Sequence, residues 1–292
     1  MGMRFGGHET FPVREGWLSK GLGVLDDDPA AFDDPFVSDR LGVGRNMGKA
    51  ISHWLRVTGL IRKPGRGEFP EFTSTAQIIY QQDPYMLHIG TWWALHINLI
   101  AQEKEAIAWP WFFNRFARER FEKSHCIEQL RQYMTMLGQK QPASKTLTRD
   151  VTCLLLSYAR PVPPESDDPE DGQDCPFRQL GLLTYFRESD TYQLNRGTKD
   201  VPPTLLGYAL ALTCDDGGQN DWLEVSFSNA LTRPAAPGRA FALTAEALAD
   251  TINHARETLG EEVIQTRLMG SDRVIQVVRR EPWEWLDTYY RG

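Results

Sequence analysis

Apolar and polar side chains between residues 45 and 56 recur with the period of an α-helix. One side carries Met47, Ile51, Trp54 and Leu55, and the other side carries Arg45, Lys49, Ser52, His53 and Arg56. This pattern predicts an amphipathic helix whose apolar side packs on the core and whose outer side is cationic.

The flanking segments predict further elements around this helix. Residues 35–41 can form a short helix capped by Asp34, and Gly42-Val43-Gly44 is a glycine turn. After the amphipathic helix, the strand-like segments TGLIRK and EFPEFTS are joined by PGRG, and Ser74 or Thr75 is expected to cap another helix. The resulting order of helix, turn, helix, hairpin and helix is that of a winged helix.

A similar order recurs twice along the chain. In the first copy, helical residues 146–158 and 176–180 precede a hairpin of LLTYF and TYQLN and the helical TLLGYALAL. In the second, a helix capped by Thr244 precedes VIQTRLM and RVIQVV, joined across Gly270-Ser271-Asp272, and then the helical EPWEWLDTYY. We therefore expect a mainly α fold of the α+β class, with small β-hairpins, helical bundles and winged-helix-like modules that are candidate repeats.

An acidic, proline-containing stretch, PVPPESDDPEDGQD at residues 161–174, has six acids and no base. Prolines and like charges oppose compact packing, so this stretch is the candidate linker. It would separate a DNA-binding and helical domain at 1–160 from a C-terminal domain at 175–292 with further winged-helix-like units. A long surface loop within one domain is the alternative.

The charge is distributed unevenly along the chain. The net charge is −7, but residues 40–67 contain seven bases and no acid, so this segment is +7 and the remainder is −14. Such a patch is an electrostatic footprint for a polyanion, and a helix with this stripe can enter the major groove of DNA. The expected DNA-binding residues are Arg45, Asn46, Lys49, His53 and Arg56 on the helix and Arg62, Lys63 and Arg66 on the wing. The alternative is a solvated helix face that lies against the protein's own acidic surface.

Cysteine spacing and hydropathy indicate the class of protein. The four cysteines lie far apart and form no C-x-x-C pair, so neither a zinc ribbon nor a disulfide framework is expected. The N-terminus lacks the apolar stretch of a signal peptide, and residues 88–101 are too short to span a bilayer and predict a buried helix. We expect a cytoplasmic protein without a membrane partner.

The string LGVGRNMGKA does not fit a nucleotide-binding motif. Five residues separate Gly42 from Gly48, where a P-loop needs four, and Ala50 follows Lys49 where Ser or Thr would reach magnesium. The dinucleotide fingerprint would need glycine at Met47. No nucleotide cofactor is expected.

The segment GGHETFPVREGWL offers candidate chemistry at His8, Glu9 and Arg14. A histidine and a carboxylate can serve as acid and base or as metal ligands, and an arginine can hold a phosphate. The alternative is a turn whose polar groups satisfy one another and whose aromatic side chains enter the core. Arg149 and Asp150, near the start of an apolar helix, are expected to form an intramolecular ion pair.

Several strings together resemble the domain-of-unknown-function family 4007. They are GHETFPVREGWL, LGVGRNMGKAISHWL, TGLI, DPYMLHIGTWWALH, SKTLTRDV and CPFRQLGLL, and the likeness extends from residue 5 to about 280. The resemblance implies a component of a bacterial DNA phosphorothioation and phage-defence system, with DNA nicking before sulfur incorporation. It also implies partners similar to a cysteine desulfurase, an ATP-dependent sulfur-transfer enzyme and an ATPase.

Two functions stay open at this point. The protein is either a nicking endonuclease assisted by Mg²⁺ or Mn²⁺, with His8 and Glu9 in its site, or a non-catalytic DNA-binding adaptor that recruits the modification machinery. The usual nuclease motifs are absent from the sequence.

Overall fold

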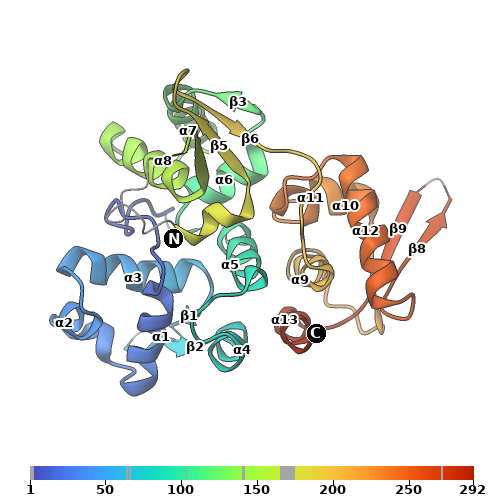
Figure 1. Cartoon of the computed structure of the whole chain (residues 1–292), viewed down its shortest axis with the longest axis horizontal. Coiled ribbons are helices and arrows are strands. Elements are labelled where there is room, and N and C mark those ends of the chain that lie inside the picture. The colour runs from blue at the N-terminus through green and yellow to red at the C-terminus, as the bar shows by residue number, and fades with distance from the viewer. Residues whose placement is uncertain are drawn as a thin grey trace.

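The computed structural model describes residues 3–63, 65, 67–102, 104–139, 142–164, 175–270 and 272–292. Within these residues the protein combines many helices with three small sheets (Figure 1). The predicted class, mainly α with small β-hairpins, is therefore correct. The order of the elements also agrees with the predicted modules, whereas their identity as winged helices or repeats stays a prediction.

The N-terminal region contains the predicted helices and the first hairpin. Its elements are α1 (Trp17–Asp27), the 3-10 helix η1 (Ala31–Asp33), α2 (Val37–Leu41), α3 (Arg45–Val57), β1 (Ile61–Arg62), β2 (Glu71–Phe72) and α4 (Ser74–Gln82). β1 and β2 pair antiparallel, with Ile61 opposite Phe72. The cap of α4 is Thr73, whose hydroxyl accepts the Ala76 N–H at 3.2 Å, one residue before the predicted position.

Helix α5 (Ile89–Ala101) runs through the centre of the molecule, as its apolar sequence predicts. It is followed by α6 (Ala108–Arg115), β3 (Arg120–Phe121), α7 (Lys123–Met136), α8 (Ser144–Tyr158) and β4 (Ala159–Val162). Trp54 of α3 meets Trp109 of α6 edge to face at 5.4 Å, so the core joins the N-terminal helices to the central ones. Within the described residues, no helix combines the length and the apolar character needed to cross a bilayer.

The second sheet contains strands from both sides of the predicted linker. After the 3-10 helix η2 (Pro176–Leu180) come β5 (Leu183–Phe186) and β6 (Thr191–Leu194), and the strand order is β3-β6-β5-β4. β4 pairs parallel with β5, whereas β6 pairs antiparallel with both of its neighbours. Residues 165–174 of the predicted linker lie outside the described residues, but the strands that precede and follow them share one sheet.

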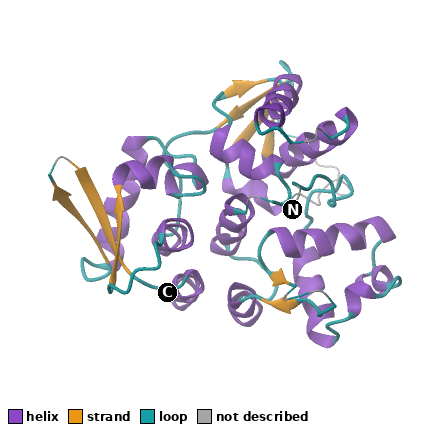
Figure 2. Cartoon of the chain, turned by 180° about the vertical axis from the view of Figure 1, so that it is seen from behind, coloured by secondary structure: helices purple, strands orange, loops and turns teal. Residues whose placement is uncertain are grey.

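The C-terminal region builds a third sheet beside a helix pair. Its elements are α9 (Pro203–Cys214), β7 (Trp222–Ser226), α10 (Phe227–Thr232), α11 (Pro237–Ala240), α12 (Ala245–Leu259), β8 (Ile264–Met269), β9 (Asp272–Val278) and α13 (Pro282–Arg291). The strand order is β7-β9-β8, and the predicted hairpin of β8 and β9 projects from the helices (Figure 2). α9 and α13 lie side by side because Gly207 leaves room for the Trp285 ring. All four cysteines are buried and free.

Candidate nucleic-acid interface

Helix α3 is amphipathic, and its polar stripe is narrower than the sequence pattern indicates. Ile51, Trp54 and Leu55 are fully buried, whereas Arg45, Asn46, Lys49 and Arg56 are exposed. Because helical positions 45, 49, 52 and 56 fall on one face, the exposed bases form one line along the helix.

His53 is a correction to the predicted stripe, because its side chain is buried and not on the outer face. Only 5% of the residue is exposed, and Gly7 of the N-terminal loop lies so close that a Cβ there would approach His53 Nδ1 to 2.5 Å. Burial is the main cause that lowers the pKa of His53 to about 3, and the charges of Arg56 and His8 add to the effect. The ring is therefore neutral at physiological pH and is not available as a surface contact to DNA.

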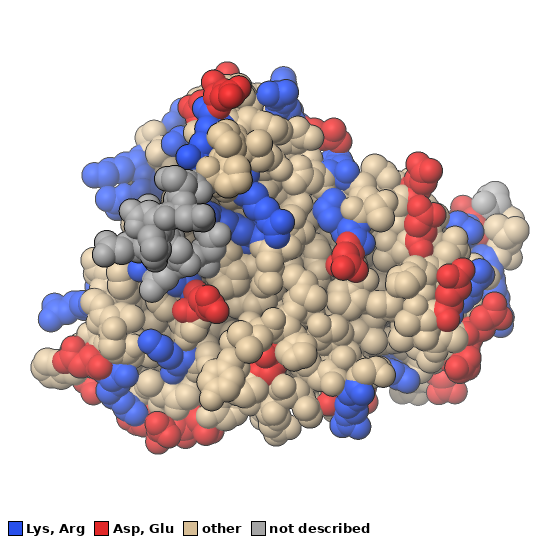
Figure 3. All heavy atoms as spheres, in the orientation of Figure 1, with Lys and Arg blue, Asp and Glu red and all other residues tan. Residues whose placement is uncertain are grey.

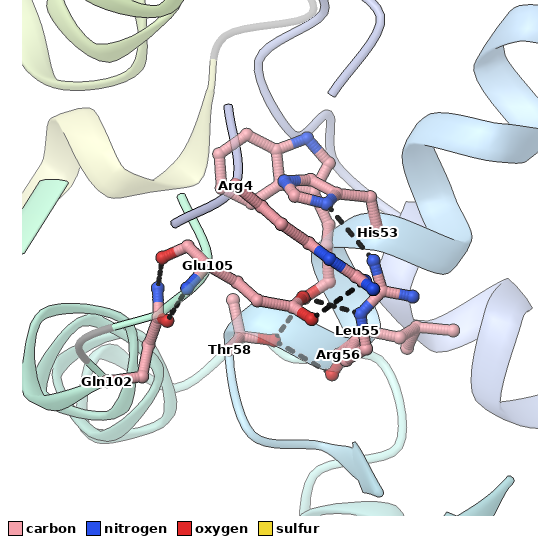
Figure 4. Close-up of polar contacts among 8 residues, drawn as sticks. Arg4, His53, Leu55, Arg56, Thr58, Gln102 and Glu105 are labelled. Atoms are coloured by element: carbon pink, nitrogen blue, oxygen red, sulfur yellow. Dashed lines mark hydrogen bonds and ion pairs between the residues drawn. The ribbon is translucent and has the colours of Figure 1, made fainter. Parts of the chain in front are cut away.

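Arg56 belongs to a polar network that joins α3 to the loop after α5 (Figure 4). Its Nε donates to Glu105 at 2.7 Å, and its Nη2 lies 3.5 Å from His53 Nδ1. Glu105 also accepts from Arg4 at 3.2 Å, and its backbone N–H donates to Gln102 at 2.7 Å. A phosphate bound to Arg56 would therefore compete with Glu105 for the guanidinium group.

The basic residues of segment 40–67 divide into those with an acidic partner and those without one. Arg40 forms an ion pair with Asp28 at 2.7 Å, and Arg62 forms one with Glu71 at 3.4 Å. Over the part of the chain that the structure describes, Arg45, Lys49 and Lys63 have no ion pair. The predicted Arg66 lies outside the described residues. Some cations of the basic segment are therefore neutralised by acidic side chains of the protein itself, and others have no such partner.

His8 is held in the interior by hydrogen bonds at both of its ring nitrogens. It is 1% exposed, its Nδ1 accepts the Thr10 N–H at 3.0 Å, and its Nε2 lies 3.1 Å from Asp150 Oδ1. Since Nδ1 accepts, Nε2 carries the proton and donates it to Asp150. With both nitrogens engaged, the predicted role of His8 as acid, base or metal ligand has no free atom to act through in this arrangement. The structural alternative describes this segment better.

Asp150 is the buried anchor for the N-terminal loop and not the partner of Arg149. Its side chain is fully buried and also accepts the Gly6 N–H, at 3.1 Å from each carboxylate oxygen. The expected ion pair between Arg149 and Asp150 is therefore wrong, and Arg149 is exposed without an ion pair to any residue the structure describes. The N-terminal loop is thus held by a hydrogen bond from Gly6 to Asp150, which is 144 residues further along the chain. This bond positions Glu9 beside α3.

Two cavities flank this loop. The larger, about 610 Å³, lies between α3 and the η1–α2 segment and is lined by Gly7, Glu9, Phe32, Asp33, Asp34, Pro35, Val37, Ser38, Arg45, Gly48, Lys49, Ser52, His53 and Arg56. The smaller, about 450 Å³, is lined by residues 5–10 together with Asn46, Thr146, Arg149 and Asp150. Glu9 lines both cavities, so the N-terminal loop lies between two adjacent cavities that open on the same polar surface.

Arg149 also belongs to this surface, although the sequence analysis did not predict it to bind DNA. The signal was present, because Lys145 and Arg149 are four residues apart on one face of α8 and both are exposed. Figure 3 shows Lys and Arg side chains gathered over α8, while Asp and Glu side chains gather over α12 at the opposite edge. We call Arg45, Asn46, Lys49, Lys145 and Arg149 the α3–α8 face.

The candidate catalytic residues do not converge. Glu9 is exposed beside both cavities with φ of 50°, a left-handed conformation that is uncommon for glutamate. Arg14 lines neither cavity, and its guanidinium carbon lies 5.9 Å from the Phe11 ring centre and 5.6 Å from that of Trp17. The described residues also contain no group of three or more His, Cys, Asp or Glu side chains that could hold a metal ion.

Two solved structures resemble this fold over almost its whole length. A magnesium ion-bound SspB crystal structure has a TM-score of 0.83 and 25% sequence identity, covering 98% of this chain and 88% of that chain. An SspB crystal structure has a TM-score of 0.84 with the same identity and coverage. No functionally curated protein matches the sequence. The family profile described as protein of unknown function (DUF4007) matches residues 5–290, and the chain belongs to this family.

Proposed function

We propose that the protein is a DNA-binding component of a bacterial DNA phosphorothioation system and that the α3–α8 face is its DNA-binding surface. The observation that carries the proposal is the position of Arg45, Lys49 and Arg149. These three exposed cations lie around the two cavities, and none forms an ion pair with a described residue. The likeness to SspB and the resemblance to phosphorothioation components support the pathway.

The electrostatic argument favours a polyanion as the partner. A chain of net charge −7 repels DNA over most of its surface, so its attraction depends on a local gathering of cations. Exposed arginine and lysine side chains without acidic partners release DNA counterions on binding without first breaking an internal ion pair. Asn46 lies between them on the first turn of α3, where it can read a base edge in the winged-helix geometry that forms part of this proposal.

The test is duplex binding measured by fluorescence anisotropy across a range of salt concentrations. The R45Q/K49Q variant is expected to bind more weakly, with a slope of log affinity against log salt shallower by about 1.8, since each phosphate contact contributes about 0.9. The matched control is R267Q/R273Q, which removes two exposed arginines from the distant β8–β9 hairpin. Equal binding and equal slopes for the two double variants would overturn the proposed surface.

DNA nicking is the second candidate activity. The exposed and conformationally unusual Glu9 beside both cavities favours it, as does the magnesium-bound relative. Supercoiled plasmid is incubated with wild-type protein and with the E9Q variant, each with Mg²⁺ or Mn²⁺ and again with a chelator. Open circles that form with the wild type and not with E9Q would support nicking. If the wild type binds DNA and leaves the plasmid supercoiled, the adaptor function that recruits the sulfur-transfer partners is favoured.

A further inference from the structure

The larger cavity beside α3 has two walls of different chemistry. One wall is the polar face of α3, with Arg45, Lys49 and Ser52. The opposite wall comes from η1 and the segment before α2, with the half-buried Phe32 ring and the exposed carboxylates of Asp33 and Asp34. Cations therefore face an aromatic ring and hydrogen-bond acceptors across one opening.

We propose that this cavity binds a single DNA nucleotide turned out of the base stack, with its phosphate on the α3 wall and its base on the η1 wall. The inference rests on the proposed function, because the nucleotide must be delivered by DNA bound at the α3–α8 face. Enzymes and binding proteins that act on individual bases commonly take up such extrahelical nucleotides.

The cationic wall fixes the position of the phosphate. Arg45 and Lys49 are exposed and have no ion pair with a described residue, so both can donate to phosphate oxygens. Asp33 and Asp34 on the facing wall repel a phosphate. The nucleotide can therefore enter in one orientation only.

The η1 wall has the groups that a base requires. An aromatic side chain such as Phe32 offers a stacking surface, and carboxylates accept hydrogen bonds from exocyclic amino groups. Asp34 already uses one oxygen to accept the Phe36 N–H at 2.9 Å, whereas the Asp33 carboxylate accepts no hydrogen bond from a described residue. Cytosine, adenine and guanine carry amino groups and thymine does not, so this wall favours the first three.

The size and the remaining polar atoms of the cavity agree with this ligand. A volume of about 610 Å³ lies within the range of small-molecule sites, roughly 300 to 1,000 Å³. His53 also lines the cavity, and its Nε2 is buried with no hydrogen-bond partner among the described residues. The cavity wall thus contains one buried polar atom that has no hydrogen-bond partner among the described residues.

The experiment compares four duplexes of identical flanking sequence by anisotropy: a fully paired one, one with a single bulged cytosine, one with a single bulged thymine, and one whose bulge is abasic. The bulged cytosine is expected to increase affinity roughly tenfold over the paired duplex, and the abasic bulge should lose this gain because it keeps the phosphate without the base. A bulged thymine should gain less than cytosine.

Variants separate the two walls. F32L keeps apolar packing and should lower the preference for the bulge while leaving binding to the paired duplex unchanged. D33N keeps the size of an exposed side chain but removes a charge that repels phosphate, so it should lower the ratio of bulged to paired affinity even if binding to every duplex becomes tighter. F36A is the matched control, because Phe36 is 65% exposed nearby and does not line the cavity. Circular dichroism checks that each variant is folded.

The outcomes distinguish this inference from the proposed function. If no duplex binds, the proposed function fails; if all four duplexes bind equally, DNA binding stands and the nucleotide site is overturned. A competition experiment with free dCMP tests the nature of the ligand. If added dCMP removes the preference for the bulged duplex, the assignment of the cavity to a nucleotide is supported. If dCMP binds as tightly as the bulged duplex, the site takes a free nucleotide and the extrahelical assignment is overturned.

Discussion

At the scale of single residues, burial decides which polar groups are available for binding. Arg149 and Asp150 are neighbours in the sequence, but Arg149 is exposed on the α3–α8 face and Asp150 is fully buried against His8. A carboxylate in this position is stabilised by the N–H groups that point at it, and those groups depend on it in return.

The first prediction concerns this buried anchor. D150A is expected to lower the free energy of unfolding by about 3 kcal/mol, because it leaves the buried His8 Nε2–H and the half-buried Gly6 N–H without their acceptor. Urea denaturation followed by circular dichroism measures the change. R149A is the matched control and should stay within about 0.5 kcal/mol of wild type. A D150A protein as stable as R149A would contradict the anchoring role.

The second prediction concerns pH and two buried histidines. Burial lowers the pKa of His53 to about 3 and that of His96 to about 3, whereas both take up protons near pH 6.5 when unfolded. Between these values the unfolded chain binds more protons, so stability is complete above about pH 6.5 and is lost as the pH falls toward 3. Each histidine contributes a slope of up to about 1.4 kcal/mol per pH unit.

Urea denaturation between pH 7.5 and pH 5.0 measures this slope above the range in which most carboxylates titrate. H53Q should reduce the slope, because glutamine takes up no proton. H254Q is the control, since His254 is exposed on α12. A stability that does not change between these pH values would show that the buried histidines do not have the lowered pKa values.

At the scale of elements, the α3–α8 face depends on the loop that joins its two helices. Gly6 hydrogen-bonds to α8 through Asp150, and Gly7 lies against His53 of α3. Gly7 has φ of 80°, and a side chain there would meet the His53 ring, so only glycine fits this close approach. The loop therefore determines the spacing between the cations of α3 and those of α8.

The third prediction tests the contribution of α8. R149Q is expected to weaken duplex binding and to make the salt slope shallower by about 0.9, as one lost phosphate contact implies. R267Q, on the distant hairpin, should behave as wild type in the same anisotropy titration. If R149Q retains both the affinity and the slope of wild type, α8 does not belong to the interface.

At the scale of the whole molecule, the two edges differ in charge: the α12 edge carries acidic residues together with the exposed arginines of the β8–β9 hairpin. Basic groups gather over α8, and the outer face of α12 carries Glu246, Asp250 and Glu257 (Figure 3). The chain after the predicted linker also shares a sheet with the chain before it, since β5 and β6 pair with β4 and β3. The DNA-binding surface proposed here thus lies at the edge opposite α12.

The fourth prediction follows from the shared sheet. The acidic, proline-containing sequence at 165–174 is the expected site of limited proteolysis. The two products should elute together in gel filtration without denaturant, because the hydrogen bonds of the four-stranded sheet join them. Products that separate into two folded fragments would instead support independent domains at 1–160 and 175–292.

The sequence by itself determined the local elements and the family. Helical periodicity predicted α3 and α8, and alternating runs around short turns predicted the hairpins of β5 with β6 and of β8 with β9. These elements depend on side chains that are only a few residues apart, so their patterns can be recognised in short segments of the sequence. The motifs that resemble family 4007 were likewise recognisable in the sequence, and the family profile confirmed them.

Only the tertiary structure decided which polar groups are free. His53 has the helical spacing of an outer residue, but the loop at Gly7 covers it, and Arg56 meets Glu105, which is 49 residues away along the chain. The partner of His8 is 142 residues away. Periodicity specifies which side of a helix a residue occupies, but not what the rest of the chain places against that side, and long-range packing supplies that information.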